Sequence, residues 1–264
     1  MEKIWTKDEL RDQLRAFDFI KGHVVHVHSS LRAVGKTEGR GEGLLDVLIE
    51  QFTADGGLLT IPTHTWDGDG VDLTRADTCV GTLARLAAAD PRGVRTSHPS
   101  HSMAVFGAPE RVAAFIEREA TATTPAPPDG CYGKLAEEDG YVLLVGVGHN
   151  RNTFLHSVDE RMNVPNRLSD APVAKTVIHR DGRREIRYAH THAAEGIGDV
   201  SANYPKLEPA FRLHGCITDA TLGSAKVQIC SARKMQEVYE AVYARAGGRE
   251  LFADLSPLDP ALYQ

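Results

Sequence analysis

The chain has 264 residues, of which 42% are hydrophobic and 25% are charged, and its formal net charge is −6. These are values of an ordinary globular protein, so they exclude a disordered or low-complexity chain, and the length suits one domain or two small ones. The acidic balance without a basic stripe argues against a nucleic-acid partner, and it suits either solubility or a cationic small-molecule partner.

The start of the sequence and its cysteines indicate a cytoplasmic protein. Residues 2–14 are charged and contain no apolar signal-peptide core, and the longest apolar run, 141–147, is too short to span a bilayer. The four cysteines show no CxxC spacing, which excludes a zinc ribbon or a thioredoxin motif; they are Cys79, Cys131, Cys216 and Cys230. We therefore expect a reducing compartment and no membrane partner.

Strands and helices alternate along the chain, which favours a single α/β domain over residues 1–264. The first predicted helix is capped by Thr6 and Glu9 in a capping box. The segments that follow it are predicted in the order strand 23–28, helix 43–52, strand 57–61, helix 82–89, strand 103–106 and helix 109–119.

The second half continues the alternation. Its most apolar strand, 141–145, is expected inside the sheet, and a helix from about Asn152 to Asn163 follows it directly. A hairpin around Asp181-Gly182 precedes the last strand, 226–230, and the last helix, 232–246. The irregular segments 63–72 and 121–130 are long enough to suggest functional loops. The predicted fold is a central mostly parallel or mixed sheet flanked by helices.

Phosphate-binding and nucleophile motifs are incomplete in this sequence. The run Gly35-Lys36-Thr37 lacks the earlier glycine of a P-loop, because that position is Ser30. The run Gly146-Val147-Gly148 lacks the third glycine of a dinucleotide site, because that position is Arg151. No GxSxG nucleophile elbow is present.

Two His-x-His pairs, His26 with His28 and His190 with His192, suggest metal binding, because both members of a pair share one face of a strand. Neither pair continues into the Asp-His sequence of binuclear hydrolases, and no HExxH is present. We therefore favour half-buried strands over metal sites and predict no metal cofactor.

The segment 146–161 carries the strongest chemical signal. A buried strand ends in a glycine turn, and His156 follows in the first turn of the next helix. Asp159 and Glu160 lie three and four residues later, so a carboxylate is expected beside the imidazole. Active sites of α/β sheets form where strands end, so His156 is a candidate general base. The alternative is a surface histidine paired with Asp159 for stability, and spacing alone does not separate the two.

Two other segments are candidate walls of a site. Residues 28–32 follow the first sheet strand, and their hydroxyls, arginine and backbone N–H groups suit a phosphate or an oxyanion. Residues 95–102 form a proline-stiffened loop that is rich in hydrogen-bond donors. The alternative for both segments is an ordinary polar turn.

Five segments, in order, resemble the aminoglycoside 3-N-acetyltransferase family: HSSLRAVG at 28–35, GGLLTIPTHTW at 56–66, RTSHPSHSMAVFG at 95–107, GKLAEEDGYVLLVGVGHNRNTFLH at 133–156 and VPNR at 164–167. The resemblance covers about residues 5–245. It implies transfer of an acetyl group from acetyl-coenzyme A to the 3-amino group of 2-deoxystreptamine aminoglycosides, and hence antibiotic resistance. It also implies an α/β fold of the family's own type, distinct from the common acetyltransferase fold.

The same resemblance assigns residues to roles. His156 falls on the catalytic histidine and is expected to deprotonate the amine during direct transfer in a ternary complex, with Asp159 or Glu160 orienting the ring. The coenzyme is expected to contact two segments, through His28, Ser29, Ser30, Leu31, Arg32, His98, Ser100 and Ser102. The acceptor is expected to contact Trp66, Asp67, Asp69, His149 and His192. For the acidic loop, the alternative is solvated surface charge.

The sequence departs from the family pattern where the acceptor is recognised. Arg85 stands where relatives carry an acidic residue, and His190-Thr191-His192 replaces an acidic stretch. A same-fold acyltransferase for a non-antibiotic amine therefore stays open as an alternative, as does the more remote alternative of a histidine-dependent metal hydrolase. The sequence also leaves open a homodimer and an acetylated Cys131 intermediate.

Overall fold

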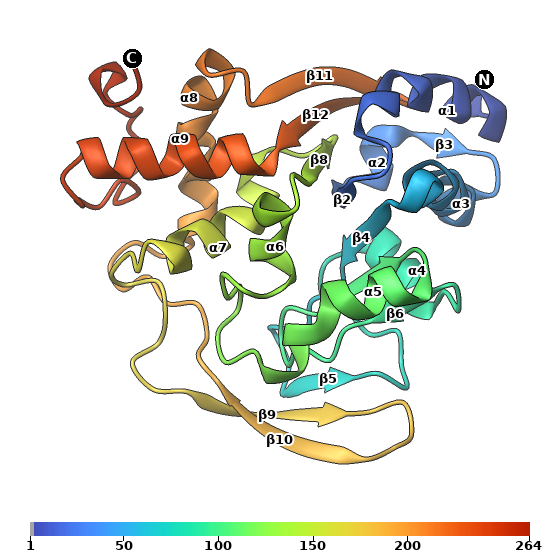
Figure 1. Ribbon diagram of the computed structural model, residues 1–264, viewed down its shortest axis with the longest axis horizontal. Coiled ribbons are helices and arrows are strands. Elements are labelled where there is room, and N and C mark those ends of the chain that lie inside the picture. Colours follow the sequence, from blue (N-terminus) through green and yellow to red (C-terminus); the bar gives the residue numbers. More distant parts are fainter. Residues whose placement is uncertain (1–2) are drawn as a thin grey trace.

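A computed structural model describes residues 3–264 (Figure 1). Its centre is a seven-stranded sheet in the order β11-β12-β8-β2-β4-β7-β6. The strands are β2 (Val24–Ser29), β4 (Leu58–Pro62), β6 (Gly93–Arg95), β7 (Met103–Phe106), β8 (Tyr141–Val145), β11 (Ile217–Leu222) and β12 (Ala225–Ser231). Only β8, β2 and β4 run parallel, and every other pairing in this sheet is antiparallel. The predicted α/β class with a mixed sheet is confirmed.

Helices cover both faces of this sheet. One face carries α1 (Lys7–Leu14), α3 (Arg40–Phe52) and α4 (Thr82–Ala89). The other carries α5 (Pro109–Ile116), α6 (Cys131–Glu137), α7 (Phe154–Arg161), α8 (Glu208–Leu213) and α9 (Ala232–Arg245). None of the helices in the described part of the chain combines the length and the apolar run that crossing a bilayer requires.

Side chains of β2 alternate between the two faces of the sheet, so this strand contributes to the packing on both. Val25 and Val27 enter the hydrophobic cluster under α1 and α3, and Val24 enters the cluster under α6 and α7. His26 and His28 share the face of Val24, because residues two apart on a strand point the same way. The His26 ring packs against Tyr132 of α6, with centroids 5.2 Å apart. The sheet thus delivers histidines to the α6 and α7 side.

Smaller elements surround the main sheet. Strands β10 (Arg184–Ala189), β9 (Val173–Ile178) and β5 (Gly70–Asp72) form a second sheet, set apart at the bottom of Figure 1. Strands β1 (Ile4–Trp5) and β3 (Lys36–Thr37) pair beside the short α2 (Leu31–Val34). The 3₁₀ segments are Arg15–Ile20, Ala54–Gly56, Glu117–Thr121, His149–Arg151, Val200–Leu207 and Pro260–Leu262. The predicted hairpin is therefore β9–β10.

Most predicted elements match the structure, and the exceptions have local causes. The Thr6–Glu9 capping box is present, with Glu9 N donating to Thr6 Oγ1 over 3.1 Å. The helix expected from Asn152 begins instead at Phe154, because residues His149–Arg151 form a 3₁₀ segment and Asn152 has a non-helical backbone with φ −81° and ψ 84°. The Asn152 side chain bonds His149 Nδ1 over 3.1 Å. Helix 109–119 changes to 3₁₀ geometry after Ile116. The elements that were not predicted are the strands β1, β3, β5, β6 and β11 and the helices α2, α6 and α8; β5 lies within the segment 63–72 that was expected to be irregular.

Candidate active site

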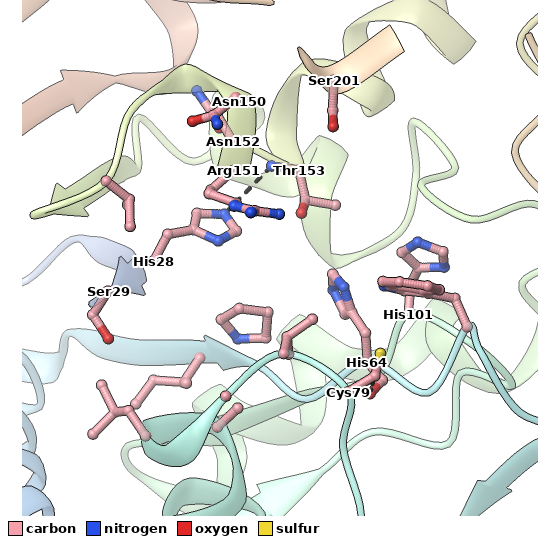
Figure 2. A pocket seen from close by; sticks show the side chains of 18 of the residues that line it. His28, Ser29, His64, Cys79, His101, Asn150, Arg151, Asn152, Thr153 and Ser201 are labelled. Atoms are coloured by element: carbon pink, nitrogen blue, oxygen red, sulfur yellow. Dashed lines mark hydrogen bonds between the residues drawn. The ribbon is translucent and has the colours of Figure 1, made fainter. Parts of the chain in front are cut away.

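A cavity of about 860 Å³ opens where the parallel strands end. Ser29 closes β2, His64 follows β4, Val147 follows β8 and His101 precedes the antiparallel β7, so all of them reach the same edge of the sheet. Figure 2 shows His28 and Ser29 on one side of the cavity and His64 and His101 on the other, with the Asn150–Thr153 turn between them. The cavity therefore lies at the carboxyl ends of the parallel strands, where the active sites of α/β sheets form.

His156, the third residue of α7, lines this cavity. Its Nδ1 lies 2.8 Å from the hydroxyl of Tyr204, and that hydroxyl lies 2.6 Å from Oδ2 of Asp159. The Asp159 carboxylate therefore reaches the imidazole through a phenol and not by the direct contact that the spacing predicted. The reason is that Asp159 faces the core, where it is fully buried, whereas His156 faces the cavity.

The contacts from His156 through Tyr204 to Asp159 form a relay, and the available protons fix the direction of each hydrogen bond in it. The Asp159 carboxylate accepts from Tyr204, from the Tyr239 hydroxyl and from Arg167 Nε, the last over 3.3 Å. The Tyr204 hydroxyl has one proton, which it donates in its hydrogen bond to the Asp159 carboxylate. The phenol oxygen can therefore only accept from His156, so the hydrogen of that bond is on Nδ1 of the imidazole. The lone pair of His156 then sits on Nε2. This is the tautomer that a general base needs.

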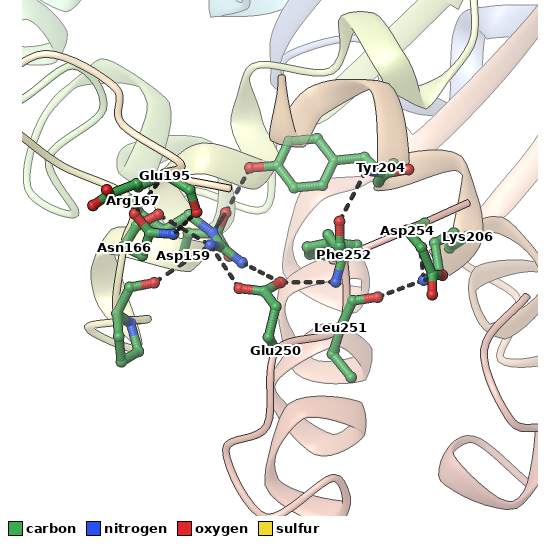
Figure 3. A network of polar contacts seen from close by, with 12 residues as sticks. Asp159, Asn166, Arg167, Glu195, Tyr204, Lys206, Glu250, Leu251, Phe252 and Asp254 are labelled. Carbon is green, nitrogen blue, oxygen red and sulfur yellow. Dashed lines mark hydrogen bonds and ion pairs between the residues drawn. The ribbon is translucent and has the colours of Figure 1, made fainter. Parts of the chain in front are cut away.

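Burial and charge act in opposite directions on the network shown in Figure 3. Burial raises the pKa of Asp159, while Arg167 and the two phenols oppose the shift. Arg167 is itself held by two 2.9 Å bonds to the carboxylate of Glu250. Burial, with the neighbouring His192 and Arg167, lowers the pKa of His156 well below its ordinary value. The imidazole is therefore neutral at pH 7 and able to accept a proton.

Glu160 does not orient His156, so that part of the prediction is wrong. Its carboxylate accepts from the Thr124 hydroxyl and, over 2.8 Å, from the Ala126 N–H. Both partners belong to the irregular segment 121–130. Glu160 thus ties this segment to α7, and burial raises its pKa to about 7.

This raised pKa predicts a pH-dependent stability. Because Glu160 binds its proton more tightly in the folded chain, its contribution is fully present below about pH 4.5 and is lost as pH rises to 7. A shift of this size corresponds to about 3 kcal/mol. We expect Glu160→Gln, whose amide retains both contacts, to gain about that much relative to wild type between pH 4.5 and pH 8, measured by urea unfolding. Glu137→Gln, on the exposed end of α6, is the control, and an equal slope in all three proteins would contradict the prediction.

The predicted coenzyme residues divide into two groups. His28, Ser29, Ser30, Leu31, Arg32 and Ser100 all line the cavity. His98 and Ser102 do not, so they were wrongly predicted as contacts. His98 Nδ1 accepts from the Ser100 and His101 N–H groups, and the Ser102 hydroxyl donates to the Thr63 carbonyl over 2.8 Å. These two side chains hold the loop in shape and leave Ser100 and His101 to face the cavity.

The predicted acceptor residues also divide. Trp66 and His192 line the cavity, and Trp66 is 53% exposed. His149 is fully buried, with its ring 5.2 Å from that of Phe211, so its prediction as an acceptor contact is wrong. Asp67 and Asp69 lie outside the cavity lining. Within residues 3–264, Asp199 is the one acidic residue that lines it.

Two residues of the network could not be found from local spacing because they are remote in the chain: Tyr204 on η5 (Val200–Leu207) and Tyr239 on α9 both approach Asp159. Arg167 lies only eight residues from Asp159, in the VPNR segment at 164–167, but no contact with the carboxylate was predicted for it. His64 and His101 stand inside segments that the sequence analysis singled out, but no role was predicted for them. Among the described residues, no group of three His, Cys, Asp or Glu side chains is placed to hold a metal ion.

The backbone N–H groups of the turn between β8 and α7 are already used in hydrogen bonds within the protein. The backbone N–H groups of Arg151, Asn152 and Thr153 all donate inside the turn, and Thr153 N also lies 3.4 Å from His28 Nε2. They are thus not free to bind an oxyanion. The guanidinium groups of Arg32 and Arg151, which line the cavity, are its fixed positive charges.

Comparison with known proteins gives a consistent result. A family profile described as aminoglycoside 3-N-acetyltransferase matches residues 26–244. Aminoglycoside N(3)-acetyltransferase IV of Salmonella sp is 32% identical over 170 residues, which span 62% of this chain and 62% of that relative, less than two thirds of its length. A variant of AAC(3)-IVa in complex with a gentamicin is 23% identical, with a TM-score of 0.76 over 100% of this chain and 92% of that one. AAC-IIIb in a binary complex with CoASH is 17% identical, with a TM-score of 0.74 over 89% and 95%.

Proposed function

The chain belongs to the aminoglycoside 3-N-acetyltransferase family, and from this premise we propose that it transfers an acetyl group from acetyl-coenzyme A to the 3-amino group of a 2-deoxystreptamine aminoglycoside. The observation that carries the proposal is the position of His156, whose base nitrogen is oriented by the Tyr204–Asp159 relay beside a cavity of about 860 Å³. Similar structures hold a gentamicin or CoASH, which supports both substrates.

The proposed reaction is a direct transfer in a ternary complex. The amine nitrogen bonds to the thioester carbonyl carbon while His156 Nε2 accepts its proton. The C–S bond then breaks, its electron pair leaves with the coenzyme sulfur, and the imidazolium protonates the resulting thiolate. Asp159 stabilises that imidazolium through Tyr204. A positioned base of this kind contributes about 10²–10⁴-fold to the rate.

The coenzyme fits the cationic side of the cavity. Arg32 and Arg151 line it and carry the geometry that guanidinium groups use for phosphates. Ser29 and Ser30 contribute hydroxyls nearby, although the Ser30 hydroxyl already accepts from Ala33 N over 3.3 Å. In our proposal these residues hold the phosphate and pantetheine parts, and the acetyl group lies toward His156.

The charge of the cavity favours a second class of acceptor, a non-antibiotic amine with few positive charges. An aminoglycoside carries several ammonium groups, and carboxylates are their natural partners. The lining holds one carboxylate among the described residues, Asp199, against the guanidinium groups of Arg32 and Arg151. This balance suits an acceptor with fewer positive charges, which would make the protein a same-fold acyltransferase for a non-antibiotic amine.

Coenzyme A release measures both possibilities. Purified protein and acetyl-coenzyme A are incubated with a panel of 2-deoxystreptamine compounds and with simple amines and amino sugars. Turnover of the first set, with acetylation at the 3-amino group, supports the main proposal, and turnover of the second set alone supports the alternative. Metal analysis of the same sample tests the remaining hydrolase alternative.

From the relay we predict the effect of removing the Tyr204 hydroxyl oxygen. Tyr204→Phe leaves the ring in place but deprives the His156 Nδ1–H of its acceptor and Asp159 of a donor. Because a buried donor left without its acceptor costs about 1–3 kcal/mol, we expect kcat to fall about tenfold or more while the KM for acetyl-coenzyme A is unchanged. Tyr243→Phe on α9 is the matched control. Unaltered kcat in Tyr204→Phe would remove the phenol from the mechanism.

A further inference from the structure

The segment that follows the β9–β10 hairpin brings one histidine to the catalytic one. The backbone of His192 bridges to Leu168, which holds the residue against the exit from α7. The His192 ring then lies between two others: its centroid is 4.0 Å from that of His156, with the planes 31° apart, and 4.8 Å from that of His101, edge-on. The ring is fixed by packing on both sides.

The two nitrogens of His192 are used differently. The backbone carbonyl of Arg167 acts on the His192 ring and raises its pKa, against the larger lowering by burial. Nε2 is buried without any partner among the described residues, so we place the ring proton on Nδ1, the nitrogen left to interact with that carbonyl. Burial lowers the pKa of His192 to about 4, which keeps the ring neutral near pH 7. Nε2 therefore carries an unused lone pair on a residue that lines the cavity.

We propose that His192 is an acceptor-binding residue, and that its Nε2 accepts a hydrogen bond from the acceptor amine or from a hydroxyl adjacent to it, beside His156. A buried acceptor atom without a partner costs free energy, which a donor group of the bound substrate recovers. The stacked rings place this bond next to the reacting nitrogen, so it selects acceptors that present a donor there. This inference deepens the proposed function and rests on it.

Two substitutions distinguish the effect of the Nε2 lone pair from the effect of the stacked ring. His192→Phe keeps a flat ring stacked on His156 but has no lone pair, and His192→Gln restores an acceptor oxygen. We expect His192→Phe to raise the KM of the acceptor about tenfold, the effect of one hydrogen bond, with kcat and the KM of acetyl-coenzyme A within about twofold of wild type. His192→Gln is expected to recover most of the loss. His190→Phe, the same exchange two residues earlier and outside the cavity lining, is the control.

Each outcome decides a different question. An unchanged acceptor KM in His192→Phe, or an equal rise in His190→Phe, overturns the role of His192 while leaving the proposed function in place. If wild type acetylates no amine in the panel, the proposed function fails. The role of His192 is then read from the nitrogen resonances of histidine-labelled wild type, in which an amine binding beside Nε2 shifts that signal. A signal that no amine shifts, because Nε2 is bound to water only, overturns the inference.

Discussion

His156→Ala is expected to lower kcat for acetyl transfer by about 10²–10⁴-fold, the contribution of a positioned general base. The alanine variant removes the nitrogen that accepts the amine proton but leaves the lining of arginines and hydroxyls that we assign to the coenzyme. The KM for acetyl-coenzyme A is therefore expected to stay near its wild-type value. Coenzyme A release under saturating substrate measures the effect.

The fold is expected to survive this change, because the His156 side chain faces the cavity and its side-chain hydrogen bond is to the Tyr204 hydroxyl. A thermal melt close to that of wild type would show this. Added imidazole, which fits the space left by the missing ring, is expected to restore part of the activity. Near-normal turnover in His156→Ala would reject the base assignment, and a large fall in melting temperature would point to a structural role instead.

Asp159→Ala is expected to cost about 3–5 kcal/mol of unfolding free energy, because it leaves Arg167 buried with one charge partner fewer and two phenols without their acceptor. Urea unfolding measures this loss. Activity is expected to fall as well, because the His156 imidazolium loses the negative charge that stabilises it through Tyr204. The two effects share one cause, the burial of the carboxylate in the core.

An exposed ion pair provides the comparison. Glu240 on α9 lies 3.2 Å from Arg161 on α7, and the two side chains are 37% and 56% exposed. Glu240→Ala is expected to cost at most about 1 kcal/mol and to leave turnover unchanged, because solvent screens such pairs. Equal losses in the two variants would mean that the Asp159 network contributes no more than a surface contact.

The local elements were predictable because their causes are local. Helix 82–89 and strands 103–106 and 141–145 follow from periodicity and apolar runs, and their bounds match the structure. Strand β11 was missed because its burial is partial and irregular, so its sequence lacks the clean alternation of a half-buried strand. Helix α6 was missed because the residues at its start are polar or small and show no clear helical periodicity.

The site was only partly predictable. His156, His28 and Ser29 could be placed at the strand ends because a parallel sheet brings consecutive carboxyl ends to one edge. The partner of His156 could not, since Tyr204 is 48 residues away and meets it only after η5 (Val200–Leu207) packs on α7. His149 and His98 show the reverse case: polar residues near a site turned inward and bonded the backbone or core side chains.

By itself, then, the sequence determined the α/β alternation, the edge of the sheet at which the candidate site lies and the family to which the chain belongs, because these depend on periodicity and on short motifs. Only the tertiary structure decided which carboxylate is linked to His156, that a phenol lies between them, and that the His192 ring stacks on that of His156. The physical reason is that side-chain partners across a core are selected by packing between distant elements. Residue spacing along the chain carries no information about that packing.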